Sequence, residues 1–148
     1  MFNSLFGFGP VQVNGRDELD FDRRFQLELD YLRNYTLLKD IKGVLVNQTN
    51  GAFYLTVMFR ENALTPNQKL NVLNAKAKDK VERLVKNVAL DKRFVYYLLA
   101  ATGICVVPLT GFNCSLQGFR VTLLESDDRK FEWVFRTLKD RITEYLKS

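Results

Sequence analysis

A long stretch without charged residues, from Phe94 to Phe119, constrains the fold more than any other feature of the sequence. Such a stretch belongs either in a membrane or in the core of a folded domain. Its apolar part runs only from Phe94 to Val107 and then meets Pro108 and Gly111, so it is too short and too irregular to cross a bilayer. We therefore expect it to form buried core, and we expect no membrane partner.

The length and composition of the chain fit one globular domain. Its 148 residues match the size of a typical single domain. With 47% hydrophobic residues, 26% charged residues and 3 prolines, the composition excludes collagen-like, mucin-like and intrinsically disordered proteins. A chain of this length buries enough apolar surface to fold without disulfides or a structural metal.

The positive net charge does not by itself indicate a nucleic-acid partner. The chain has 22 Lys and Arg residues against 17 Asp and Glu residues, which gives a net charge of +5. The two signs are interleaved, and the one denser basic stretch, from Lys76 to Lys86, has the spacing of a solvent-exposed helix face. We therefore expect no nucleic-acid binding.

The absence of histidine removes several kinds of catalysis at once. Ser-His-Asp and Cys-His nucleophiles, histidine metal ligands and the usual proton shuttle all require that side chain. The two cysteines, Cys105 and Cys114, are expected to remain free thiols in a reducing, cytoplasmic setting, because no cleavable apolar leader is visible. The chain alone is poorly equipped for chemistry, and we predict no catalytic or metal-binding residue in it.

Hydrophobic periodicity divides the chain into an arm and a folded domain. Residues 1–19 predict an irregular apolar arm, and residues 20–148 predict the domain. The predicted elements are a helix from Asp20 to just before Gly43, a strand from Val44, a hairpin turn at Asn50-Gly51, a strand over 52–59, a helix over Leu70–Val88, a helix from Asp91 to Thr102, strands over 104–108 and 119–124, and a final helix from Ser126.

This order of elements predicts an α+β fold. We expect a two-layer sandwich in which helices pack on a small, mostly antiparallel or mixed sheet of about four strands. The strand over 52–59 is apolar on both faces and is expected to be covered on both sides. The buried face of the final helix is predicted to contain Phe131, Val134, Phe135, Leu138, Ile142 and Tyr145.

Arg120 does not fit its surroundings. It lies inside the segment FRVTLL (119–124), which is otherwise suited to the interior of a sheet. A guanidinium stays charged, and burying it unpaired costs several kcal/mol, so an anion must meet it. That anion is either an acid of the same domain, such as Glu61 or Glu125, or a ligand carboxylate held by the planar fork of N–H donors.

Three segments in a fixed order carry a family resemblance. NGAFYLTVMF (50–59), TGICVVPLTGF (102–112) and GFRVTLLE (118–125) together resemble the C-terminal part of class I and II pyridoxal-phosphate aminotransferases. The alanine-aminotransferase-like branch is the most similar. The resemblance covers roughly residues 20–148, which the family would place in its small, C-terminal domain.

The resemblance implies a role for Arg120 and a cofactor. In that family the arginine of the last motif binds the α-carboxylate of the substrate, so Arg120 becomes the substrate-binding candidate. Such enzymes are homodimers that transfer an amino group between an amino acid and a 2-oxo acid, with pyridoxal phosphate as the electron sink. No lysine here has the sequence context of the family's Schiff-base lysine, and the cofactor is bound mainly by a large domain. The resemblance therefore implies a small domain that is inactive in isolation.

A stand-alone module derived from that domain is the alternative hypothesis. In that case Arg120 recognises a carboxylate without chemistry, and the chain acts as a binding or scaffolding protein. The two hypotheses differ in whether the gene encodes the lysine motif upstream of Met1.

Overall fold

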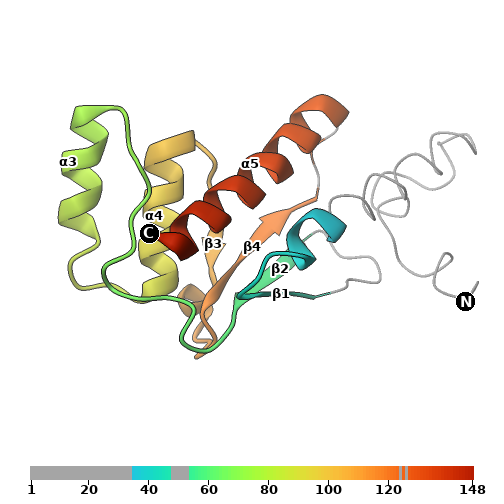
Figure 1. The fold of residues 1–148 in the computed structure, drawn as a ribbon, viewed down its shortest axis with the longest axis horizontal. Coiled ribbons are helices and arrows are strands. Elements are labelled where there is room, and N and C mark those ends of the chain that lie inside the picture. Colours follow the sequence, from blue (N-terminus) through green and yellow to red (C-terminus); the bar gives the residue numbers. More distant parts are fainter. Residues whose placement is uncertain (1–34, 48–53, 124, 126) are drawn as a thin grey trace, which may run out of the picture.

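A four-stranded sheet with helices packed on it forms the computed structural model of the chain, which describes residues 35–47, 54–123, 125 and 127–148 (Figure 1). The strands lie in the order β1-β2-β4-β3, and every neighbouring pair is antiparallel. The predicted α+β fold is therefore confirmed, with an antiparallel sheet. In chain order, a helical segment at 35–39 precedes β1 (Val44–Val46), β2 (Tyr54–Phe59), α3 (Ala75–Leu84), α4 (Leu90–Thr102), β3 (Val107–Pro108), the 3-10 helix η1 (Leu109–Phe112), β4 (Gly118–Thr122) and α5 (Asp128–Lys147).

Strands β1 and β2 pair as the predicted hairpin requires. Val46 lies opposite Val57, and the Asn47 amide donates to the Thr56 carbonyl at 3.0 Å. The predicted turn residues Asn50-Gly51 lie outside the described residues, as do the arm over 1–19 and the predicted helix start at Asp20. The register places every second residue of β2 on the helix side of the sheet.

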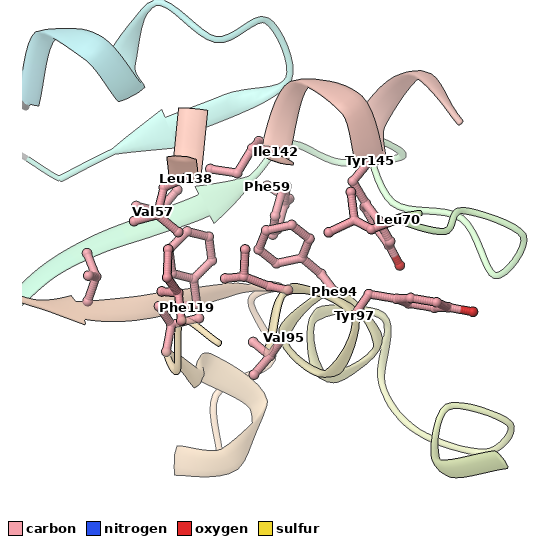
Figure 2. Close-up of a cluster of buried hydrophobic side chains, with 14 of the residues drawn as sticks. Val57, Phe59, Leu70, Phe94, Val95, Tyr97, Phe119, Leu138, Ile142 and Tyr145 are labelled. Carbon is pink, nitrogen blue, oxygen red and sulfur yellow. The ribbon is translucent and has the colours of Figure 1, made fainter. Parts of the chain in front are cut away.

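Helices α4 and α5 cover the same face of the sheet, and Phe94 of α4 lies at the centre of that contact (Figure 2). The Phe94 ring centroid lies 5.3 Å from that of Phe59 on β2, 5.5 Å from that of Phe119 on β4 and 5.1 Å from that of Tyr145 on α5. Aromatic pairs at these separations add to the stabilisation from burial. A single ring therefore joins the sheet to both helices.

Local hydrogen bonds fix the start of α5 and the end of α4. Asp127 caps α5, because its carboxylate accepts the amides of Arg129 and Lys130. Gly103 ends α4 in the left-handed conformation, with φ of 77°, and its amide donates to the Leu99 carbonyl. The end of α4 agrees with the prediction, and α5 begins two residues after the predicted Ser126. On α5 the predicted face is covered, with Phe135, Leu138, Ile142 and Tyr145 fully buried and Phe131 and Val134 partly so.

The predicted helix over Leu70–Val88 is too long, because only 75–84 is helical. The preceding residues run along the end of α5, where the Lys69 amide donates to Ser148 Oγ at 3.0 Å and the Asn71 amide donates to Glu144 Oε1 at 3.3 Å. Gln68, Leu70 and Val72 are buried while the residues between them are exposed, which is the alternation of an extended segment and not of a helix. Leu73, placed on the apolar stripe by the helical spacing, is 92% exposed.

Three strand predictions also change in detail. The strand predicted over 52–59 is described over 54–59, and burial alternates along it, so the expectation that it is covered on both sides is wrong for the described part of the fold. The strand predicted over 104–108 is reduced to Val107–Pro108. The strand predicted over 119–124 runs from Gly118 to Thr122.

The uncharged stretch supplies core, as predicted. Its Phe94, Leu98 and Phe119 are fully buried. Among the helices of the described residues, none combines the length and the apolar character needed to span a bilayer.

Gly118 of β4 is expected to tolerate no side chain. A Cβ there would overlap the backbone carbonyl of Val57 and lie 2.9 Å from Leu109 Cδ1. Gly118→Ala should therefore lower the free energy of unfolding by about 1–3 kcal/mol, as overpacking does. Urea unfolding followed by circular dichroism measures the change.

Gly111→Ala is the matched control. A Cβ at Gly111 would meet only Pro108 Cγ, at 3.9 Å. Both substitutions alter the unfolded chain alike, so their difference reports the contact in the folded state. Equal unfolding midpoints for the two variants would contradict this account of Gly118.

Candidate functional site

The face of the sheet opposite α4 and α5 is only partly covered by the described residues. Strand alternation places Arg120 on this face, opposite Thr56 of β2 and Val107 of β3. We call it the open face, and it comprises Leu45, Tyr54, Thr56, Met58, Val107, Arg120 and Thr122.

Two aromatic rings hold the Arg120 guanidinium. Its Cζ atom lies 4.7 Å from the ring centroid of Tyr54 on β2 and 4.9 Å from that of Phe112 on η1. Both rings are themselves about half exposed. A cation over an aromatic face is stabilised by roughly 0.5–2 kcal/mol. The two contacts therefore explain how a charge is kept on an otherwise apolar strand.

No acid of the described residues forms an ion pair with Arg120. Of the two acids considered from the sequence, Glu125 lies 2.7 Å from Lys130 instead, and Glu61 is exposed. The hydrogen bond from Lys130 lowers the pKa of the Glu125 carboxyl. Neither Glu61 nor Glu125 therefore forms the ion pair with Arg120 that the sequence analysis considered.

The geometry suits Arg120 to bind a planar anion. Aromatic contacts occupy the flat faces of a guanidinium, whereas its N–H donors lie in its plane and match the two oxygens of a carboxylate. The exposed apolar side chains of Leu45, Tyr54, Val107 and Phe112 lie on or beside this face. If a further protein surface covers these side chains, the guanidinium and a carboxylate bound to it are removed from water. The attraction between the two charges then increases.

Asp91 of α4 is a second polar centre, and it holds the segment that carries Phe112. Its carboxylate is fully buried and accepts the Thr110 amide at 2.9 Å, the Thr110 hydroxyl at 2.6 Å and the Lys92 amide at 2.7 Å. The Asp91 amide donates to Gln117 Oε1 at 3.0 Å. One residue therefore contacts both η1 and the start of β4.

The sequence predicted a helix that starts at Asp91, which would make this residue its cap. The N-cap position is Ala89, whose side chain makes no capping bond, and Asp91 lies within the first turn. An acid is favourable there because of the helix dipole. Its partners Thr110 and Gln117 follow much later in the chain, so local sequence contains no signal that could have identified them.

A third group of polar atoms lies where α4 meets the end of α5. The buried Arg93 guanidinium donates to the Val85 carbonyl at 2.8 Å and to the Gln68 carbonyl at 3.4 Å. Arg93 Nε and the hydroxyls of Tyr97 and Tyr145 are the buried side-chain polar atoms of the described residues without a hydrogen-bond partner. In Figure 2 the two hydroxyl oxygens lie at the same end of the aromatic cluster.

The described part of the chain offers few side chains that could bind a metal ion or a cofactor. No cluster of three or more Cys, Asp or Glu side chains suited to a metal ion occurs among those residues. Cys105 is exposed, Cys114 is partly exposed, and both are free thiols. All described lysines are exposed or only partly covered.

Comparison with known proteins gives one informative match. No family model matches the chain. The chain is 55% identical over 114 residues to an uncharacterized aminotransferase of Methanocaldococcus jannaschii. The matched part is 77% of this chain but only 26% of that protein, so the chain spans about a quarter of the relative's length. The relationship therefore concerns a part of a larger protein.

Tyr145 provides a test of the packing between α4 and α5. Burial raises the pKa of its phenol to about 12, and the positive charge of Arg93 opposes this shift. An unfolded tyrosine ionises near pH 10. Raising the pH above about 10 therefore ionises this residue in the unfolded chain before it does so in the folded chain, which favours unfolding. The contribution of the neutral phenol is thus complete below about pH 10 and should be lost as the pH rises to about 12.

Tyr145→Phe removes the ionising group, so the decline in stability between these pH values should be smaller in the variant. Urea unfolding of both proteins across the alkaline range gives the difference in unfolding free energy at each pH. Tyr96→Phe, at a partly exposed position of α4, is the control and should keep the wild-type decline. A decline that is unchanged in Tyr145→Phe would contradict the assignment.

Proposed function

We propose that the chain is the small, C-terminal domain of a pyridoxal-phosphate aminotransferase, of the alanine-aminotransferase-like branch, and that Arg120 binds the α-carboxylate of the substrate. The observation that carries the proposal is the Arg120 guanidinium, held between Tyr54 and Phe112 and without an acidic partner among the described residues. The name of the M. jannaschii relative supports it, and so does the short share of that protein which the chain spans.

In this function Arg120 contributes binding and orientation. A carboxylate that meets two N–H donors of the planar guanidinium is held in one orientation, which places the rest of an amino acid or 2-oxo acid relative to the sheet. The large domain of the same enzyme would cover the open face and exclude water, which strengthens the charge pair. The proposed parent enzyme is a cytoplasmic homodimer.

The described residues do not fit a pyridoxal-phosphate site. A lysine that forms an imine needs a lowered pKa, which proteins obtain by burying the amine or by placing another cation beside it. None of the lysines in the described part is buried. When bound, the cofactor supplies the electron sink for amino-group transfer. We therefore assign the cofactor to the large domain, and to this chain only the contacts with the substrate carboxylate.

A stand-alone carboxylate-binding or scaffolding module is the second candidate. The absence of a buried lysine among the described residues favours it, since Arg120 could then bind a carboxylate without any reaction. Reading the gene upstream of Met1 separates the two. An open frame that encodes the family's lysine motif supports the domain of an enzyme, and an in-frame stop supports the module.

Arg120→Lys tests the carboxylate site directly. The variant keeps the charge and loses the planar fork, so acetate should bind about 10- to 100-fold more weakly, the equivalent of roughly 1.5–3 kcal/mol for charge-assisted hydrogen bonds. Titration of the isotope-labelled chain with sodium acetate, followed by NMR at constant ionic strength, measures the affinity. Sodium chloride serves as the matched titrant.

The free energy of unfolding should change by no more than about 0.5 kcal/mol, as for other surface substitutions. Equal acetate affinity in wild type and variant would show that Arg120 is not the receptor. A large loss of stability would instead identify Arg120 as a structural residue.

The purified chain should form no specific imine with pyridoxal phosphate. All described lysines are accessible to water, so each should react only weakly and without preference. Mixing the chain with the cofactor, reducing with borohydride and mapping the adducts by mass spectrometry tests this expectation. Stoichiometric labelling of a single lysine would overturn the division of roles proposed above, whereas sparse labelling of many lysines agrees with it.

A further inference from the structure

We infer that Asp91 is a positioning residue for Arg120. Through Thr110 it fixes the 3-10 helix η1 and thereby holds the Phe112 ring against the Arg120 guanidinium. The inference rests on the proposed function, because it gives Asp91 a role in shaping the carboxylate site.

The carboxylate of Asp91 is bound in a way that a neutral side chain cannot reproduce. Its Oδ1 accepts from the Thr110 hydroxyl and the Lys92 amide, and its Oδ2 accepts from the Thr110 amide. An amide group has one oxygen and one NH₂, so in either orientation it would oppose a donor to a backbone N–H. Three donors at a fully buried site are therefore matched by the two oxygens of a carboxyl group and not by an amide.

The segment that Asp91 holds has little other regular support. Strand β3 has two residues, η1 has four, and no side chain caps η1. The connection continues through Asn113, whose φ of 57° is left-handed, to Gln117. Asp91 binds near both ends of this connection, at Thr110 with its carboxylate and at Gln117 with its amide.

The two rings that hold Arg120 differ in how they are fixed. Tyr54 is the first residue of β2 and pairs with Thr122 of β4, so its backbone is held by the sheet. Phe112 is the last residue of η1, is 52% exposed, and takes its position from the path of that segment. Releasing Thr110 should therefore move Phe112 while Tyr54 stays in place.

Thr110→Val is the variant that tests this chain of contacts. It keeps the size of the side chain and the backbone amide, and it removes the hydroxyl that lies 2.6 Å from Asp91 Oδ1. Thr110→Ser retains a hydroxyl and is the rescue variant. Thr102→Val is the matched control, because the Thr102 hydroxyl also bonds at α4, to the Leu98 carbonyl, but at the far end of that helix.

Two readouts on the isotope-labelled chain separate positioning from simple stability. The first is the NMR shift of the Arg120 Nε–H group, which the neighbouring rings displace, together with its nuclear Overhauser contacts to Phe112. The second is the dissociation constant for sodium acetate. A residue that only stabilises the fold would lower the melting temperature and move neither readout.

We expect Thr110→Val to lose the Phe112 contacts, to shift the Arg120 resonance toward its unfolded position and to weaken acetate binding severalfold. Thr110→Ser should restore both readouts, and Thr102→Val should leave both unchanged. An unchanged Arg120 resonance in folded Thr110→Val would overturn the inference. If the wild-type chain binds no acetate, the proposed function fails, while the resonance still tests the positioning role.

The wild-type chain gives a test that needs no folded variant. The Thr110 amide hydrogen should exchange with solvent as slowly as the core amide hydrogens of α4, because its acceptor is a fully buried carboxylate. Nuclear Overhauser contacts should join the Phe112 ring to the Arg120 side chain. Fast exchange at Thr110, or the absence of those contacts, would contradict the inference even if Thr110→Val fails to fold.

Discussion

The packing of Phe94 is the interaction on which the rest of the structure depends. Its ring contacts Phe59, Phe119 and Tyr145, and so joins two strands and the last helix to α4. Because α4 and α5 both pack on this side, the opposite face of the sheet is left to shorter described segments such as η1, whose Phe112 contacts Arg120. The one-sided core therefore creates the surface on which a functional residue can be displayed.

Helix α4 does more than fill the core. Three nearly adjacent residues of this helix contact different parts of the fold. Asp91 accepts hydrogen bonds from Thr110 of η1, and Phe94 packs against the sheet. Arg93 donates to the carbonyls of Val85 and Gln68. These side chains point in different directions because successive helical residues are rotated by about 100°. The helix thus couples the hydrophobic core to the segment beside Arg120, and the proposed carboxylate site depends on a residue in the opposite layer.

Arg120 shows how a charged residue can be kept on an apolar strand. It lies close to two aromatic rings, and no acid of the described residues forms an ion pair with it, so its charge is stabilised without a described carboxylate occupying its donors. An internal carboxylate would have stabilised the charge as well but would have occupied those donors. The arrangement therefore favours recognition of an external anion, which is the basis of the proposed function.

Local sequence determined the elements whose signals are local. Periodicity predicted α4 and α5, short apolar runs predicted β2 and β4, and an arginine within such a run marked Arg120 as exceptional. Tertiary structure decided the rest. The residues before α3 pack against the end of α5, where the Lys69 and Asn71 amides find acceptors, and Asp91 of α4 binds Thr110. Those choices depend on donors and acceptors far apart in the chain, which meet only after the layers have packed.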